Sequence, residues 1–178
     1  MPELVPAPDP ALGAVSTARY NPGMSNRPLN AEQYLAVRSS AIHGRGVYAR
    51  RAIPAGTRII EYRGEHISVD EAEARYPDDF SGPHHTFLFA LEDGTIVDAA
   101  YRGNRARWIN HSCSPNCETV IEDGRIWVES IRDIAAGEEL SYDYNIILDA
   151  RHTPAMKKRF PCVCGAPGCR GTLLGRKR

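Results

Sequence analysis

The sequence predicts a mostly β fold made of small sheets, and three observations lead to that prediction. Short runs rich in β-branched and aromatic residues recur at close intervals along the chain. Two of these runs contain an Asp-Gly pair, at 93–94 and at 123–124, which is the strongest short-range signal for a hairpin turn. Helical periodicity is brief, and the sequence contains no internal repeat. A chain of 178 residues with this pattern fits a single domain.

The predicted elements follow one another from an N-terminal arm. Residues 1–33 hold six of the thirteen prolines and show little periodicity, which predicts a flexible or loosely packed segment. Ordered structure is expected to begin near Tyr34. Beyond it we expect strands and turns at 35–40, 46–53 and 57–67, a short helix at 69–76 that Pro77 ends, and hairpins at 86–99 and 119–131.

Composition excludes several classes of protein. The chain is 42% hydrophobic and 25% charged, as globular proteins are. It has no apolar run close to the roughly 18 residues that span a bilayer. The first residues lack the basic and apolar regions of a secretory signal. The 22 basic residues balance 22 acidic ones, which argues against a basic protein that coats nucleic acid.

The zero net charge hides an uneven distribution. Residues 151–178 carry eight basic residues and no acidic one. Residues 1–150 therefore carry 14 basic against 22 acidic residues, a net charge of −8. An acidic body of this kind favours a basic protein or peptide as partner. The basic end is either a solvated tail or a contact with the acidic body or with DNA.

The five cysteines predict a metal site rather than disulfides. An odd number of cysteines without a signal peptide argues against a secreted disulfide framework. Three of them form a C-x-C-x4-C pattern with interspersed glycines, which lets three thiolates converge. A structural zinc ion needs a fourth ligand, and from spacing alone Cys113, Cys117 or His111 could supply it. The alternative is three unrelated reduced cysteines in a loop: Cys162, Cys164 and Cys169.

Two segments carry glycines or clustered polar groups that suit a ligand. Gly44 and Gly46, in IHGRGVYA, would let the backbone approach a bound molecule closely, although such a pair is often only a turn. The third glycine of a dinucleotide-binding fingerprint is absent. The segment NRARWINHSCSPNCE gathers polar side chains that need partners beside an apolar Trp-Ile pair. Those polar side chains are Asn110, His111, Ser112, Cys113 and Asn116.

The segment GEELSYDYN places two tyrosines on one face. Tyr142 and Tyr144 are two residues apart, so an extended chain directs both side chains to the same side. Tyr62, in EYRGE, is a third candidate. Several phenols that line one channel could hold an amine through their hydroxyls and ring faces. Ordinary strand tyrosines would give the same pattern.

Taken together, these motifs resemble the SET-domain protein lysine methyltransferases, and most closely their trithorax-like branch. The resemblance covers about residues 34–174 and is carried, in order, by IHGRGVYA, EYRGE, DAAYRGNRARWINHSCSPNCE, GEELSYDYN and CVCGAPGCRGTL. It implies a β-clip fold of small sheets in which the C-terminal segment threads under the NHSC loop as a pseudo-knot. It divides the chain into an arm (1–33), a SET domain (34–147), and a post-SET zinc segment with a basic tail (148–178).

The same resemblance implies S-adenosylmethionine as cofactor and assigns roles to individual residues. The methionine end of the cofactor would contact the turn between the first two strands and the hairpin residue Phe87, where the family often has tyrosine. Its adenosine end would be held by Asn110 and His111 and covered by Val163 and Leu173. The turn residues are His43, Gly44, Arg45 and Gly46.

In the family pattern four cysteines bind one structural zinc ion, and Cys117 is left over. Tyr144 occupies the position of the catalytic tyrosine, and Tyr62 lines the lysine channel. Tyr142 stands where the family has Tyr or Phe, and a hydroxyl there implies mono- or dimethylation more than trimethylation. The four implied zinc ligands are Cys113, Cys162, Cys164 and Cys169.

The sequence therefore predicts methylation of lysine on a basic protein, with a histone tail as the first candidate. The alternatives are a non-histone basic substrate, a catalytically weak SET-like interaction module, and a zinc-dependent nucleic-acid binder that uses the basic tail. We expect little or no direct nucleic-acid binding and no membrane association. The chain would act on chromatin in the nucleus if its source is eukaryotic. If its source is bacterial, it would be cytoplasmic or delivered to a host nucleus.

Overall fold

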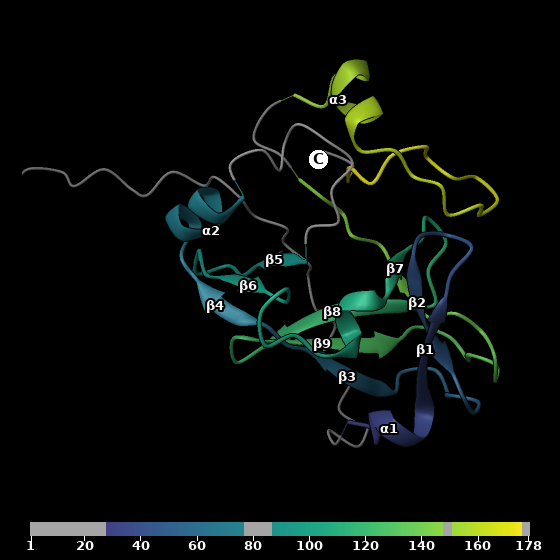
Figure 1. Cartoon of the computed structure of the whole chain (residues 1–178). Coiled ribbons are helices and arrows are strands. Elements are labelled where there is room, and N and C mark those ends of the chain that lie inside the picture. The colour runs from purple at the N-terminus through teal and green to yellow at the C-terminus, as the bar shows by residue number, and fades with distance from the viewer. Residues whose placement is uncertain (1–27, 77–86, 148–150, 176–178) are drawn as a thin grey trace, which may run out of the picture.

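The computed structural model describes residues 28–76, 87–147 and 151–175 (Figure 1). Most of the predicted arm, the segment 77–86 with its Pro77, residues 148–150 and the last three basic residues lie outside the described residues. The helices are α1 (Ala31–Tyr34), α2 (Val69–Arg75), the 3-10 helix η1 (Arg105–Trp108) and α3 (Pro154–Arg159). The strands are β1 (Leu35–Ser39), β2 (Arg45–Ala49), β3 (Arg58–Tyr62), β4 (Glu65–Ile67), β5 (Leu88–Ala90), β6 (Ile96–Asp98), β7 (Asn110–His111), β8 (Cys117–Glu122), β9 (Arg125–Ser130) and β10 (Ser141–Tyr142).

The described strands form four small sheets, which confirms the predicted mostly β fold. Two sheets have three strands, in the orders β3-β9-β8 and β4-β6-β5, and two are pairs, β1-β2 and β10-β7. All pairings are antiparallel except that of β10 with β7. In Figure 1 the three-stranded sheets lie side by side, with β1 and β2 at one end of the molecule.

Turn chemistry explains why the predicted hairpins form. Asp123 and Gly124 both have positive φ, 50° and 70°, which is the backbone of a tight type I′ turn between β8 and β9. Gly94, with φ of 82°, lies in the longer turn between β5 and β6, where its N–H donates to the Leu91 carbonyl. The helix α2 begins where Ser68 caps it, since the Ser68 hydroxyl accepts the Glu71 N–H. The predicted helix is confirmed, with Tyr76 as its C-cap.

The core lies where the sheets meet. Its side chains come from both the N-terminal and the C-terminal halves of the chain, so the sheets pack into one body. Leu29, in the last part of the predicted arm, packs against this core and donates its N–H to the Arg58 carbonyl. The largest of its fully buried side chains include Leu35, Ile53, Ile59, Ile109, Ile126, Ile134 and Leu140.

The parallel pairing of β7 with β10 joins segments that are about thirty residues apart in the chain. Ser141 pairs with Asn110 and Tyr142 pairs with His111. A second parallel bridge joins Ile146 to Leu174, so the C-terminal segment also lies beside the segment that follows β10. These pairings bring the NHSC segment, the tyrosine segment and the C-terminal cysteines together, as the implied pseudo-knot requires.

Three of the described helices were not expected from the sequence: α1, η1 and α3. The helix α3 begins after Thr153, whose hydroxyl accepts the Met156 N–H, and has Pro154 in its first turn. It exposes its basic residues Lys157, Lys158 and Arg159. Among the described residues, no helix is both long enough and apolar enough to cross a membrane.

Candidate functional site

Asn110 ties the buried NHSC segment to the glycine-containing turn before β2. Its side chain is only 3% exposed. The Asn110 Nδ2 group lies 2.9 Å from the Arg45 carbonyl oxygen and 3.3 Å from that of His43. The same group lies 2.8 Å from Oε1 of Glu139. Asn110 therefore fixes the position of the turn, and two of the predicted cofactor segments are in direct contact.

Glu139 is the acceptor on which this network converges. Its carboxylate accepts hydrogen bonds from the Ser40 hydroxyl at 2.8 Å, the Tyr48 hydroxyl at 2.8 Å and Asn110. Ser40 lies just before the turn, and Tyr48 lies in β2 just after it. A charged acceptor makes each of these bonds stronger than a neutral one would. The carboxylate thus holds both ends of the turn and the NHSC segment in one arrangement.

His111 lies between the tyrosine segment and the cysteines. Its ring is 3% exposed, and Nδ1 accepts the Tyr144 N–H at 3.1 Å. Burial lowers the pKa of His111 to about 4, against the smaller opposing effect of Asp143, so the ring is neutral near pH 7. Because Nδ1 accepts, the proton of the neutral ring sits on Nε2, which lies 3.3 Å from Sγ of Cys113. The Tyr144 N–H and the Cys113 sulfur therefore fix the orientation of the His111 ring.

The three predicted channel tyrosines converge from two distant segments. The Tyr142 and Tyr144 rings are 5.1 Å apart between centroids, which confirms that they share a face. The Tyr62 hydroxyl donates to the Phe87 carbonyl at 3.0 Å, and the Tyr144 hydroxyl donates to the Ile109 carbonyl at 2.9 Å. Among the described residues, no hydrogen bond uses the Tyr142 hydroxyl, so this phenol keeps its hydrogen-bonding capacity for another group.

All three phenols are held in their neutral form. Burial raises the pKa of Tyr62, of Tyr142 and of Tyr144 well above the usual value for tyrosine. The negative charge that Tyr144 would carry when ionised raises the pKa of the other two further. The cluster is therefore an apolar, uncharged surface that carries neutral hydroxyl groups near pH 7.

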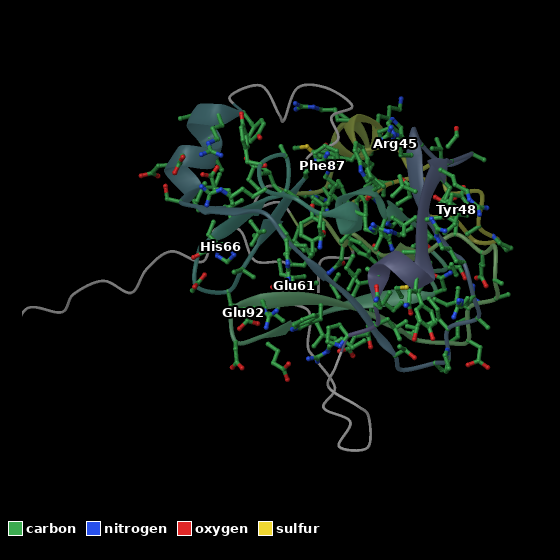
Figure 2. All side chains as sticks on the ribbon, turned by 60° about the horizontal axis from the view of Figure 1, so that its bottom comes forward. Arg45, Tyr48, Glu61, His66, Phe87 and Glu92 are labelled. Atoms are coloured by element: carbon green, nitrogen blue, oxygen red, sulfur yellow. The ribbon has the colours of Figure 1, made fainter. Side chains whose placement is uncertain are left out.

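Phe87 and Arg45 flank the same aromatic side chain. Phe87 lies edge-on to Trp108, with ring centroids 5.2 Å apart. The Arg45 guanidinium lies 5.4 Å from the Trp108 ring centroid. Figure 2 shows Phe87 and Arg45 at the same side of the molecule, away from Glu61, His66 and Glu92. The structure therefore places these two predicted cofactor residues near each other, around Trp108.

Four cysteines form a group that could hold a metal ion. The Sγ atoms of Cys113, Cys162, Cys164 and Cys169 all lie within 4.8 Å of one another. Cys113 lies 3.7 Å from Cys162 and 3.9 Å from Cys169 between sulfur atoms. Sequence spacing left the fourth member open, and in the structure it is Cys113. Cys117 is fully buried in the core and stands apart from this group.

Val163 and Leu173 extend the site on the C-terminal side. Val163 lies between two members of the cysteine group, and its side chain is 65% exposed. The Leu173 N–H donates to the Phe160 carbonyl, and its own carbonyl accepts the Ile146 N–H. These bonds hold the segment after the cysteines against Ile146, in the segment that follows β10.

Sequence reasoning missed several residues that organise the site. Glu139, Ser40 and Tyr48 form the network around Asn110. Asp143 accepts two hydrogen bonds from the Arg170 guanidinium, and so links the tyrosine segment to the residue after Cys169. The sequence does contain a signal for the Asp143–Arg170 pair. Asp143 lies between the two tyrosines of YDY, and Arg170 directly follows a predicted metal ligand.

Asn116 also connects two parts of the site. From the sequence it was only one of several polar side chains that need partners. It is 2% exposed and closes the NHSC loop onto the segment that carries β10. Its Nδ2 donates to the Glu139 carbonyl at 2.8 Å, and its Oδ1 accepts the Ser141 N–H at 2.8 Å. Buried polar groups of this kind need partners, and here the partners are backbone groups from a distant segment.

Comparisons with known proteins agree with this geometry. The sequence profile of the SET domain matches residues 44–145. A protein of Yarrowia lipolytica named histone-lysine N-methyltransferase, H3 lysine-4 specific, is 45% identical over 141 residues, which are 75% of this chain and 12% of that protein. A protein of Saccharomyces cerevisiae with the same name is 43% identical over 139 residues, again 75% of this chain and 12% of that protein.

The histone-lysine N-methyltransferase trithorax of Drosophila virilis is a third relative. It is 40% identical over 148 residues, which are 80% of this chain and 4% of that protein. The chain therefore spans only 4% to 12% of the length of these three relatives. The residues that match the SET profile include Gly44 and Gly46, the NHSC segment and the tyrosine segment.

Proposed function

The chain belongs to the SET-domain family, and from that premise we propose that it transfers a methyl group from S-adenosylmethionine to lysine side chains of a basic protein, with a histone tail as the first substrate to test. The observation that carries the proposal is the convergence of Tyr62, Tyr142 and Tyr144 beside the buried Asn110-His111 pair. The relatives are named for histone H3 lysine-4, which makes that tail the first choice.

The buried phenols suit the nucleophile that the reaction needs. A lysine amine must be neutral to attack, whereas a free lysine has a pKa of about 10.4. An apolar channel raises the free energy of the ammonium form and so lowers that pKa. The neutral hydroxyl groups of the tyrosine cluster can hold the free amine by hydrogen bonds. The proton is released to solvent before the amine attacks.

The residues around the glycine turn fit S-adenosylmethionine, which supplies a methyl group on a positively charged sulfur when it is bound. Arg45 is an exposed cation on the turn and matches the carboxylate of the methionine end. The neighbours that would complete the methionine end are His43, Gly44, Gly46 and Phe87. We assign the adenosine end to Asn110 and His111, and the cover to Val163 and Leu173.

Tyr144 would position the amine and the transferred methyl group. Its backbone is held by His111 and its hydroxyl by the Ile109 carbonyl, so both ends of the side chain are fixed. A fixed group of this kind contributes to catalysis by keeping the reacting atoms aligned. Tyr62 would line the lysine channel, held by its hydrogen bond to the Phe87 carbonyl.

The cysteine group fits a structural zinc ion. Four sulfur ligands at about 2.3 Å from a tetrahedral zinc ion lie about 3.8 Å apart. The separations of Cys113 from Cys162 and Cys169 are 3.7 and 3.9 Å, close to that value. Cysteines at 113, 162, 164 and 169 would then close a long loop and hold the C-terminal segment in place.

The Tyr142 hydroxyl bears on how many methyl groups are added. It has no hydrogen-bond partner among the described residues, so it can hold the amine or a water molecule in the channel. A bound water molecule or hydroxyl group occupies space that a third methyl group would need. We therefore propose that the products are mono- and dimethyl-lysine.

Charge supports a basic protein as substrate. Residues 1–150 carry a net charge of −8, which attracts a lysine-bearing tail and repels nucleic acid. A histone substrate would place the protein on chromatin, and the basic residues of α3 and the C-terminus would then face DNA or solvent. No membrane association is proposed.

The test is methyl transfer from labelled cofactor to core histones and to a histone H3 tail peptide, with the sites mapped by mass spectrometry. A peptide whose lysines are replaced by arginine is the control for lysine specificity. Tyr144→Phe, which keeps the ring but removes the hydroxyl, should lower the rate about a hundredfold. Cofactor binding without transfer to any basic substrate would refute the proposal and leave a binding module.

A further inference from the structure

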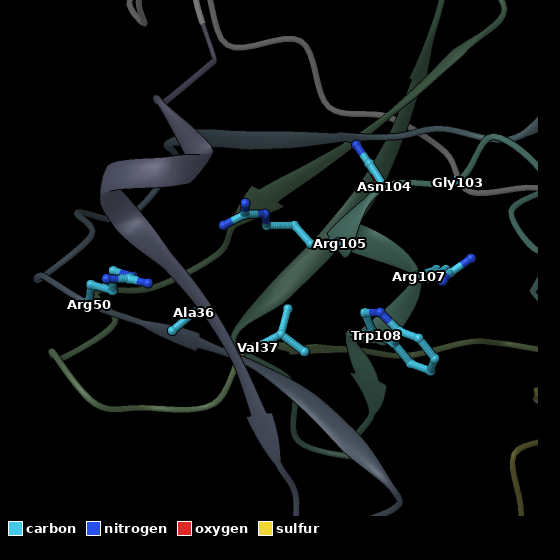
Figure 3. Close-up of a pocket in the computed structure, with 8 residues that line it drawn as sticks. All are labelled: Ala36, Val37, Arg50, Gly103, Asn104, Arg105, Arg107 and Trp108. Atoms are coloured by element: carbon cyan, nitrogen blue, oxygen red, sulfur yellow. The ribbon is translucent and has the colours of Figure 1, made fainter.

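A groove between β1 and η1, lined by arginines, adjoins the candidate cofactor site at Trp108 (Figure 3). Its volume is about 450 Å³. Figure 3 shows Arg105 reaching from η1 toward β1, which carries Val37. The lining residues are Ala36, Val37, Arg50, Gly103, Asn104, Arg105, Arg107 and Trp108. We refer to this set of residues as the arginine groove.

The arginine groove is a basic region on an otherwise acidic body. In the described part of the chain, Arg50 and Arg107 form no ion pair, and their hydrogen bonds go to the carbonyls of Leu35 and Ala99. Arg107 also stacks on Trp108, with its guanidinium carbon 4.7 Å from the ring centroid. These guanidinium groups keep donors that a carboxylate could accept from.

Within the described part of the chain, the wall of the groove is the unpaired edge of a strand. Ala36 and Val37 are adjacent in β1, so their side chains point to opposite faces, and a groove that both residues line runs along the strand edge. Within the two-stranded sheet, β2 occupies the other edge of β1. On its far side β2 is bonded to the segment 137–140, so β1 is the outer strand.

The hydrogen-bond pattern shows which backbone groups face the groove. The Arg50 N–H donates to the Tyr34 carbonyl, and the Ser40 N–H donates to the Gly44 carbonyl. Because bonded and non-bonded pairs alternate in an antiparallel ladder, the backbone groups of Val37 point away from β2. The Leu35 carbonyl, two residues earlier, accordingly accepts from the Arg50 and Arg105 guanidinium groups.

We propose that the arginine groove binds an acidic, extended peptide segment of a partner protein, which adds to the edge of β1 at Val37 and places carboxylates on Arg50 and Arg107. Backbone hydrogen bonds to an edge strand give such a peptide its affinity, and the side-chain contacts give it specificity. A duplex nucleic acid is a convex cylinder and does not enter a concavity of side-chain size. The proposal does not depend on the methyltransferase function.

The test uses a fluorescein-labelled octapeptide of alternating glutamate and valine, titrated with the full chain and followed by anisotropy. Binding should weaken with added salt. Arg50→Glu should weaken binding by about tenfold or more, because it replaces a charge-assisted hydrogen bond with a repulsion. Val37→Pro removes the outward N–H without removing a bond to β2, and should also weaken binding.

Control variants and peptides distinguish binding in the arginine groove from nonspecific electrostatic attraction. Arg151→Gln, at an exposed arginine of the C-terminal segment, should leave the affinity within about twofold. Circular dichroism checks that each variant keeps the fold. The proposal is overturned by equal binding of the matching glutamine–valine peptide, or if neither the Arg50 nor the Val37 variant weakens binding. It is also overturned if a DNA duplex binds more tightly than the peptide through Arg50, or if sedimentation shows that a second copy of the chain covers β1.

Discussion

The Glu139 carboxylate occupies the space that any side chain on Gly46 would need. A Cβ atom on Gly46 would lie 2.2 Å from Oε1 of Glu139 and 3.1 Å from Cβ of Ser40. A free glutamate side chain could move aside, but this one is held by Ser40, Tyr48 and Asn110. Gly46 is therefore required for close approach of the carboxylate rather than for an unusual backbone angle.

We predict that Gly46→Ala destabilises the fold by about 1–3 kcal/mol, because the added methyl group overpacks a fixed site. In a Glu139→Ala background the same substitution should destabilise the fold less, because the obstructing carboxylate is gone. The difference between the two losses of unfolding free energy, which is the coupling energy of the pair, should be about 0.5–3 kcal/mol. Urea unfolding of the four proteins in the cycle measures both values. Additive effects, with no coupling, would show that the two residues do not compete for this space.

The sequence predicts the local parts of this structure better than its long-range contacts. The β8–β9 hairpin follows from Asp123-Gly124, since the turn is specified by adjacent residues. The cysteine group can be predicted almost as directly, because three of its members lie within eight positions of one another in the sequence. The NHSC motif supplies the fourth, Cys113. The helix α3 was missed although Thr153 and Pro154 are ordinary start signals for a helix.

The role of Glu139 could not be predicted in this way. It is 99 positions from Ser40 and 29 from Asn110 in the chain, and nothing in the local GEEL pattern indicates which distant donors it will meet. The same holds for Asn116, whose partners lie 23 and 25 positions away. Polar contacts of this kind depend on the chain path, which local propensity and turn chemistry do not determine.

Removal of one cysteine of the metal group should release the C-terminal segment. We predict that the purified chain contains about one zinc ion and that Cys169→Ser loses it, because three thiolates hold zinc more weakly than four. Atomic emission measures the zinc content, and limited proteolysis should show faster cleavage after about residue 147 in the variant. Cys117→Ala, at the buried cysteine outside the group, should keep the zinc ion. Equal zinc content in both variants would contradict the assignment.

Replacement of Tyr142 by phenylalanine should shift the products toward trimethyl-lysine. The substitution keeps the ring contact with Tyr144 and removes a hydroxyl that lacks a described partner, so it enlarges the channel at little cost to the fold. Mass spectrometry of a peptide substrate at full conversion gives the ratio of mono-, di- and trimethylated products. Tyr76→Phe, at a phenol bonded to Asp98 outside this channel, is the matched control. If the wild-type chain already trimethylates efficiently, the proposed limit on methylation is wrong.

The buried phenols should make the chain unstable at alkaline pH. Burial raises the folded-state pKa of Tyr62, Tyr142 and Tyr144, whereas the same phenols ionise near pH 10 in the unfolded chain. Below pH 10 both states hold these protons and the phenols cause no pH dependence. Above pH 10 the unfolded chain binds fewer protons, so each phenol lowers the unfolding free energy by about 1.4 kcal/mol per pH unit until its folded pKa is reached.

Urea unfolding at pH 9, 10.5 and 11.5 measures this effect. The unfolding free energy of Tyr142→Phe should decline less steeply with pH than that of the wild type. Tyr101→Phe is the control, because this side chain is 54% exposed and its loss should leave the slope of the wild type unchanged. Parallel declines for the wild type and Tyr142→Phe would mean that the Tyr142 hydroxyl ionises as readily in the folded chain as in the unfolded one, and is not enclosed as the structure shows.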